Sequence, residues 1–142
     1  MSERFRIVDA DYGRDVALLR AVREPVFVHE QSVPLDMEWD ELDPLSRHVL
    51  ALDTAGQPIG TGRLTPEPRI GRMAVLPVWR GQGIGAAILQ RQIDAAITLG
   101  FPTVELHAQV SAIGFYERHG FSAWGDEFDE AGIRHRHMRR TL

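Results

Sequence analysis

Hydrophobic positions recur along the chain in two patterns. One is the short β-like run that is typical of strands, and the other is the spacing of three and four residues that is typical of helices. Short β-like runs, bounded by turn residues, predict seven strands. The four residues TAGQ between the second and third of these runs indicate a hairpin. The predicted strands cover residues 5–9, 48–53, 58–64, 70–76, 103–108, a start at 121–124, and 133–140.

Three segments carry apolar residues at helical spacing. Residues 15–30 predict a helix that Pro25 should kink or end, and residues 111–119 predict a short one. The acidic segment 35–45 is expected to be a loop that can include one helical turn. The clearest helix covers residues 84–99 and ends at a glycine. Its apolar face combines Ile84, Ile88, Ala95 and Leu99 with Leu89, Ile93 and Ala96.

This order of elements predicts an α/β (α+β) fold and one domain over residues 1–142. The first strands are close in sequence and should pair antiparallel, whereas a β-helix-β crossover later in the chain requires a parallel pair. The length of 142 residues is that of one ordinary domain.

Composition excludes several classes of protein. The chain has no cysteine, so disulfides, thiolate metal sites and a cysteine nucleophile are excluded. All 16 basic residues are arginine, which excludes a Schiff-base lysine and the lysine of a Walker A loop. The net charge of −4 and the lack of a long apolar run argue against nucleic-acid and membrane partners. We expect a cytoplasmic protein, because the N-terminus lacks the apolar core of a signal peptide.

A glycine-rich loop, RGQGIGAA over residues 80–87, precedes the clearest helix. Unpaired N–H groups at a helix N-terminus favour a pyrophosphate, and glycines allow it to approach closely. The loop also fits the dinucleotide pattern GxGxxA, with Glu105 as the downstream acid, although four residues separate the preceding strand from the first glycine. A structural glycine turn and a coenzyme A site are the other interpretations.

The loop and its surroundings resemble the GNAT superfamily of acyl-CoA-dependent N-acyltransferases. The resemblance rests on VLPVWR before the loop, on RGQGIG itself, and on FYERHGF over residues 115–121. The segment VREPVFVHEQSVPLDMEWDELD is similar to the ElaA-type branch, and FDEAGIRHRHM resembles it more weakly. The resemblance implies a mixed sheet that is antiparallel early and splayed at a parallel pair, with helices on both faces. A homodimer is a further possibility from the family.

The resemblance also implies a site for acetyl-CoA as co-substrate. Pantetheine would pair with the edge of the splayed strand at Met73, Ala74 and Val75. The loop would hold the pyrophosphate, and aromatic residues of the second motif would lie beside the coenzyme. The expected coenzyme ligands are these three edge residues together with Arg80, Gly81, Gln82, Gly83, Ile84, Gly85, Ala86, Phe115 and Tyr116.

Tyr116 is the expected catalytic acid, because a phenol of ordinary pKa about 10 can protonate a departing thiolate. A packing role beside Phe115 is the alternative. A base is also needed, and we expect Glu30 or His107 to act as one; His29 is a further candidate. The acidic segment suggests that Glu30, Glu38 and Asp40 bind a cationic amine at an acidic lip, together with Glu41 and Asp43.

The His135-x-His137 pair would face one side of a strand, but no third ligand is evident, so no metal site is expected. The sequence therefore predicts direct acetyl transfer from acetyl-CoA to a primary amine, a small molecule or a peptide, in a ternary complex. The alternative is a non-catalytic GNAT fold that serves as an acyl-CoA sensor or interaction module. The acceptor, the acyl length and the oligomeric state stay open.

Overall fold

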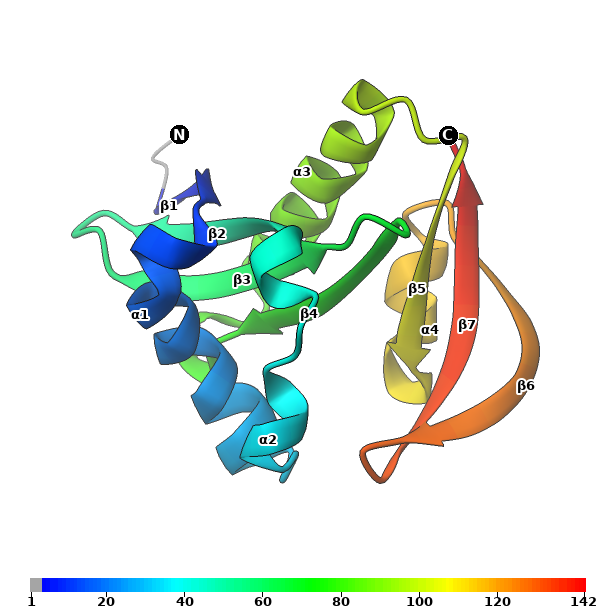
Figure 1. The fold of residues 1–142 in the computed structure, drawn as a ribbon, viewed down its shortest axis with the longest axis horizontal. Coiled ribbons are helices and arrows are strands. Elements are labelled where there is room, and N and C mark those ends of the chain that lie inside the picture. Colours follow the sequence, from blue (N-terminus) through cyan, green and yellow to red (C-terminus); the bar gives the residue numbers. More distant parts are fainter. Residues whose placement is uncertain (1–3) are drawn as a thin grey trace.

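The computed structural model describes residues 4–142 (Figure 1). The strands of this part of the chain form one seven-stranded mixed sheet. The strand order is β1-β2-β3-β4-β5-β7-β6. The strands are β1 (Phe5–Ala10), β2 (Arg47–Asp53), β3 (Pro58–Leu64), β4 (Arg69–Val75), β5 (Thr103–Gln109), β6 (Ser122–Glu130) and β7 (Ile133–Thr141). The α-helices are α1 (Tyr12–Arg23), α2 (Leu35–Glu38), α3 (Ile84–Thr98) and α4 (Ile113–Glu117). The other helical elements of the described chain are a π-helix (Glu24–Glu30) and three 3₁₀ turns (Asp43–Leu45, Pro77–Trp79 and Val110–Ala112).

All strand pairs are antiparallel except β4 and β5. This parallel pair is short, because it joins only Arg69 to Glu105 and Ile70 to Leu106. Beyond Ile70 the two strands diverge, as Figure 1 shows for the green β4 and the yellow-green β5. The predicted mixed sheet with a splayed parallel pair is confirmed.

A β-bulge lies on β4 where the strands diverge. Thr61 pairs with Ala74 and Arg63 with Gly71, so two residues of β4 lie opposite one residue of β3. Arg72, one of the two, has a φ of 49°, a left-handed conformation that is uncommon for a side-chain-bearing residue. A bulge bends its strand and increases the local twist, which turns the rest of β4 away from β5.

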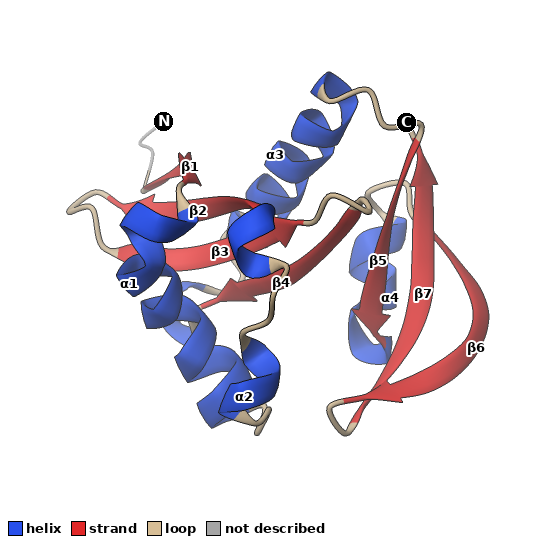
Figure 2. Cartoon of the chain, in the orientation of Figure 1, coloured by secondary structure: helices blue, strands red, loops and turns tan. Residues whose placement is uncertain are grey.

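Helices cover both faces of the sheet, as predicted (Figure 2). Successive side chains of a strand point to opposite faces. On β2, Leu50 packs with Leu19 of α1, whereas its neighbours Val49 and Ala51 pack with Ile88 of α3. The sheet therefore lies between α1 on one face and α3 on the other.

Helix α3 is seated on the sheet through its apolar face and through a glycine of β3. Ile88, Leu89 and Ile93 are fully buried in it. A Cβ atom on Gly62 would lie 2.8 Å from Cγ2 of Ile88 and 2.7 Å from Oε1 of Gln92, so this position has no room for a side chain. The close approach fixes the helix whose N-terminus carries the glycine-rich loop.

Three sequence expectations differ from the structure. The first helix begins at Tyr12 and not at residue 15, because the side chain of Asp11 caps it. As predicted from Pro25, its α-helical part ends early, at Arg23, and the chain continues as the π-helix. Strand β6 continues well past residue 124, to Glu130, and Leu99 is 49% exposed and not part of the core face.

No helix among residues 4–142 is long and apolar enough to cross a membrane. The expectation about the N-terminal leader falls partly on residues 1–3, which lie outside the described residues.

We predict that Gly62→Val lowers the free energy of unfolding by about 1–3 kcal/mol, because the new side chain must push Ile88 and Gln92 away. Urea unfolding followed by circular dichroism measures the change. Gly71→Val is the matched control on β4, since no atom of the described chain lies within 4 Å of its added Cβ. Equal losses in the two variants would contradict the close seating of α3.

Candidate functional site

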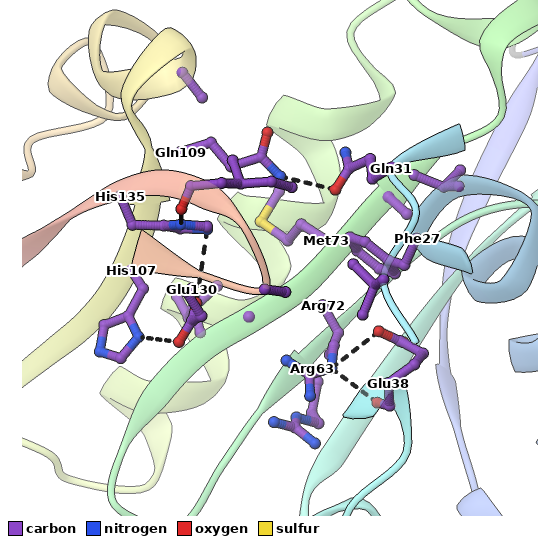
Figure 3. Close-up of a pocket in the computed structure, with 18 of the residues that line it drawn as sticks. Phe27, Gln31, Glu38, Arg63, Arg72, Met73, His107, Gln109, Glu130 and His135 are labelled. Carbon is purple, nitrogen blue, oxygen red and sulfur yellow. Dashed lines mark hydrogen bonds and ion pairs between the residues drawn. The ribbon is translucent and has the colours of Figure 1, made fainter. Parts of the chain in front are cut away.

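A cavity of about 650 Å³ opens where β4 leaves β5. It passes from the α1 face of the sheet to the α3 and α4 face, since residues of both contribute to it. Its lining includes Phe27 and Gln31 next to α1, Met73 on β4, Gly85 on α3 and Tyr116 on α4. Figure 3 shows part of this cavity, with Met73 and Arg72 of β4 and with His107 and Gln109 of β5.

The glycine-rich loop forms an open cradle at one end of this cavity. Gly81 and Gly83 have φ values of 78° and 83°, and an added Cβ on either would meet no described atom within 4 Å. Within residues 4–142, no side chain caps the N-terminus of α3, so its first N–H groups are free for an anion. The loop therefore has room and free donors for an anion such as a diphosphate, and the binding of coenzyme A by residues 81–86 stays a prediction.

The edge of β4 that faces the opening is free of β5. Ala74 and Val75 pair with β3 on their other side, while the parallel pairing with β5 has ended at Ile70. Met73, which precedes them, packs against both core clusters that α3 covers. The structure thus leaves backbone groups of Met73, Ala74 and Val75 at an unpaired edge, where an extended chain such as pantetheine can pair.

Tyr116 lies on the opposite wall of the opening from β4. Its ring packs edge-on against Phe115 and Phe121, with centroid distances of 5.1 and 6.1 Å. Its hydroxyl lies 3.9 Å from the sulfur of Met73. Burial raises the pKa of Tyr116 to about 12, so the phenol is protonated near neutral pH.

The chain matches the family model of the acetyltransferase (GNAT) domain over residues 12–142. The chain belongs to the GNAT acetyltransferase family. One relative is the uncharacterized N-acetyltransferase YjcF of Bacillus subtilis, 38% identical over 84% of this chain and 87% of its own length.

Solved GNAT structures share the fold. An acyl-CoA N-acyltransferase from Pseudomonas aeruginosa superimposes with a TM-score of 0.85 and 31% identity, over 96% of this chain and 99% of that one. Escherichia coli ElaA gives a TM-score of 0.83 and 25% identity over the same shares of the two chains. The resemblance to the ElaA-type branch is therefore confirmed.

Arg80 of this GNAT protein is bound within the protein. Its Nη1 and Nη2 donate to the carboxylate of Glu30 at 2.8 and 2.7 Å, and its Nε donates to the carbonyl of Val75. The hydrogen bonds from Arg80 lower the pKa of Glu30. The lowered pKa and the paired carboxylate make Glu30 a weak candidate for the base, while the ion pair ties the π-helix to the coenzyme loop.

Three carboxylates of the expected acidic lip belong to an ion-pair network, whereas Glu41 is exposed. Glu38, Asp40 and Asp43 are all bound to arginines from three different elements. Glu38 and Asp43 are buried, and Asp40 is 32% exposed. The arginines that neutralise these three carboxylates are Arg23, Arg63 and Arg72.

The two buried carboxylates of this network differ in their pKa. Burial raises the pKa of Glu38 in spite of the neighbouring Arg23 and Arg72. Burial also acts to raise the pKa of Asp43, but hydrogen bonds from Arg23 and from the backbone N–H of Asp40 outweigh it, and the pKa is lowered. Glu38 lines the cavity but is bound to Arg23, and Asp40 does not line the cavity. Neither residue therefore offers a free carboxylate to an amine.

His107 lies on β5 at the cavity, on the face toward α1, and its Nδ1 is 3.0 Å from Oε1 of Glu130. Glu130 and His135, on the next hairpin, line the same wall. The sequence did not single out Glu130, because the strand that carries it was expected only at residues 121–124. His135 was considered as half of a metal pair, but no group of three metal-ligating side chains occurs within residues 4–142.

A hydrogen bond closes part of the opening on the α1 side. Nε2 of Gln109, at the end of β5, donates to Oε1 of Gln31, which follows the π-helix, at 2.9 Å. Both residues line the cavity, and Figure 3 shows the bond above Met73. The end of β5 is thus linked by side chains to the segment that follows the π-helix.

A pH prediction follows from His48, a buried neighbour of the arginine network. Its Nε2 lies 2.7 Å from the carbonyl oxygen of Asp43, to which it donates, and burial lowers its pKa below the ordinary 6.5. The unfolded chain therefore binds a proton before the folded one does. We expect the free energy of unfolding to fall between pH 7 and 5, with a slope of at most about 1.4 kcal/mol per pH unit from this residue.

Urea unfolding at several pH values measures this slope. His48→Gln should reduce it, whereas His29→Gln, at an exposed position, should keep the slope of the original chain. If the His48 variant keeps the full slope, the loss of stability comes from other groups.

Proposed function

We propose that the protein transfers an acetyl group from acetyl-CoA to a primary amine, directly and in a ternary complex. The observation that carries the proposal is the Tyr116 hydroxyl, held protonated beside the free edge of β4 and opening on the same cavity as the glycine loop. A GNAT fold supports acyl transfer in general. The uncapped N-terminus of α3 and the free edge support the coenzyme.

The residues of this chain would divide the binding of the coenzyme among three places. N–H groups of residues 81–86 bind the diphosphate, because they combine free donors with the positive end of the α3 dipole. Backbone groups of Met73, Ala74 and Val75 bind the extended arm along β4. Phe115, which lies 3.8 Å from the Cβ position of Gly85, closes the α3 side.

Arg80 has a different place in the proposal from the one that its motif suggests. Three of its N–H donors are bound to Glu30 and Val75, so it holds the loop to the end of β4 and to the π-helix. The diphosphate then relies mainly on backbone N–H groups and the helix dipole.

Acetyl-CoA, when bound, supplies the acetyl group on a thioester. The amine nitrogen forms a bond to the acyl carbon, and the carbon–sulfur bond breaks. One of the two protons of the neutral amine stays on the amide, and the other ends on the sulfur. Tyr116 donates its phenolic proton to the sulfur and recovers a proton as the amide forms. Its raised pKa keeps the phenol protonated before this step.

Coenzyme binding is tested by Gly83→Glu. Acetyl-CoA at about 100 times its Kd should raise the melting temperature of the original chain by roughly 5–10 °C. The new carboxylate sits where the diphosphate would bind and should abolish this shift. Gly56→Glu is the matched control, because Gly56 has the same φ of 83° in the β2–β3 turn, with no described atom within 4 Å of an added Cβ.

Catalysis is tested by Tyr116→Phe, which removes only the hydroxyl. We expect kcat to fall by about 100-fold or more for any accepted amine, because general acid catalysis contributes about this much, while the thermal shift with acetyl-CoA persists. Tyr12→Phe, on the far side of the arginine network, is the control. Turnover of an amine panel that is unaffected by the Tyr116 change contradicts the acid role.

The same experiments separate the enzyme from a non-catalytic sensor. A chain that binds acetyl-CoA but never consumes it across a broad panel of amines is a sensor. A chain that shows no thermal shift with coenzyme A or its thioesters at millimolar concentration is neither an acetyl-CoA-dependent enzyme nor an acyl-CoA sensor.

A further inference from the structure

Three carboxylates line the cavity, and they differ in their partners. Glu30 and Glu38 are bound to arginines, as described above. Glu130 pairs with no arginine of the described chain, and its partners within 4.0 Å are the imidazoles of His107 and His135. Glu130 is therefore the cavity carboxylate whose charge is not cancelled by a permanent cation.

The tautomer of His135 follows from its hydrogen bond. Its Nδ1 lies 2.7 Å from the carbonyl oxygen of Ile133. A carbonyl can only accept, so Nδ1 carries the hydrogen and the neutral ring has a bare lone pair on Nε2. The ring of Phe128 stacks on that of His135 at 5.9 Å and 24°, which fixes the direction of this lone pair.

A second acceptor lies near Nε2 of His135. This Nε2 lies 3.6 Å from Oε2 of Glu130, as the dashed line between them in Figure 3 shows. Glu130 is ionised near neutral pH, because the hydrogen bond from His107 to its other oxygen lowers its pKa. Two acceptors without a proton between them, both at the wall of a cavity, form a site for a group with several N–H donors.

We propose that the ammonium group of the acceptor docks between Oε2 of Glu130 and Nε2 of His135, and that His135 removes its proton. The inference rests on the proposed function and assigns its acceptor subsite. The N–H bond of the ammonium breaks, its electron pair stays on the nitrogen, and the proton forms a bond to Nε2. The imidazolium then lies between Glu130 and the Ile133 carbonyl and releases the proton to solvent. The acceptor is a primary amine whose ammonium end lies against β7.

The remaining groups around His135 do not neutralise the carboxylate of Glu130. Gln109, its partner on β5, is neutral. Arg69 on β4 acts on Glu130 through space and lowers its pKa in the same direction as His107. Arg134 and Arg136, its neighbours on β7, bind Glu127 and Asp129, and the carbonyl of Gly125, respectively.

The first test is the tautomer of His135, which needs no substrate. Nitrogen-15 NMR of histidine-labelled protein with coenzyme A at pH 8 should show His135 as the Nδ1–H tautomer, assigned by its loss in His135→Gln. Addition of n-butylamine or benzylamine should then shift the Nε2 signal of His135. The shift should be lost in Glu130→Gln. An Nε2–H tautomer, or no response to either amine, overturns the proposal.

The second test is the pH profile of kcat/KM, measured by acetyl-CoA consumption with the best primary amine of a panel. The original chain should lose activity on the acid side as His135 becomes protonated. His135→Gln should lower kcat by about 100-fold and remove that limb of the profile. Glu130→Gln should raise KM for the amine about tenfold, because a neutral amide attracts the ammonium less strongly than a carboxylate.

His137→Gln is the matched control, because His137 lies on the same face of β7, packs against His107, and does not line the cavity. It should keep the profile of the original chain. The thermal shift with acetyl-CoA should persist in all three variants, which shows that they are folded. An unchanged KM in the Glu130 variant together with an unchanged profile in the His135 variant overturns this inference and leaves the proposed function standing. Absence of both thermal shift and turnover overturns the two together.

Discussion

The parallel pairing of β4 and β5 lasts for two residues, and the rest of the molecule depends on its early end. If the ladder continued past Ile70, the edge of β4 would be satisfied by β5 and the sheet would be closed. The bulge at Arg72 prevents this by turning β4 away. Nε of Arg72 donates to the carbonyl of Glu38 at 3.1 Å, so a left-handed residue that is costly by itself is held by the segment packed over it. The cavity exists because the chain stabilises this interruption of the sheet.

The segment that holds the bulge is itself held by buried charge. Arg23 is fully buried, binds Glu38 and Asp43, and lies 3.8 Å from the ring centre of Trp39. Breaking a buried pair leaves an unpaired charge, which typically costs about 3–5 kcal/mol. Arginine suits this place because it stays charged when buried and reaches two carboxylates through one planar group. The acidic residues of this segment therefore order the α1 side of the opening and are not available to attract an amine.

Local patterns predicted the parts of the fold that local chemistry determines. Helix α3 and the succession of strands along the chain follow from periodicity, and the glycine loop before α3 follows from its residues. The partners of charged side chains did not follow, because Arg23 and Asp43 lie 20 residues apart in sequence and meet only in the folded chain. Glu130 was missed for a related reason. Strand β6 is mostly exposed and polar, WGDEFDE, so neither period marks it, and only pairing with β7 makes it a strand.

The two chemical roles of the site lie on different faces of the same sheet. Tyr116 belongs to the layer of α3 and α4, where apolar neighbours keep its phenol protonated. Glu130 and His135 belong to the uncovered face of β6 and β7, where polar neighbours keep a carboxylate ionised. A continuous sheet would separate an acid and a base placed in this way. Since β4 and β5 part between them, both open on one cavity, and each keeps the environment that sets its protonation state.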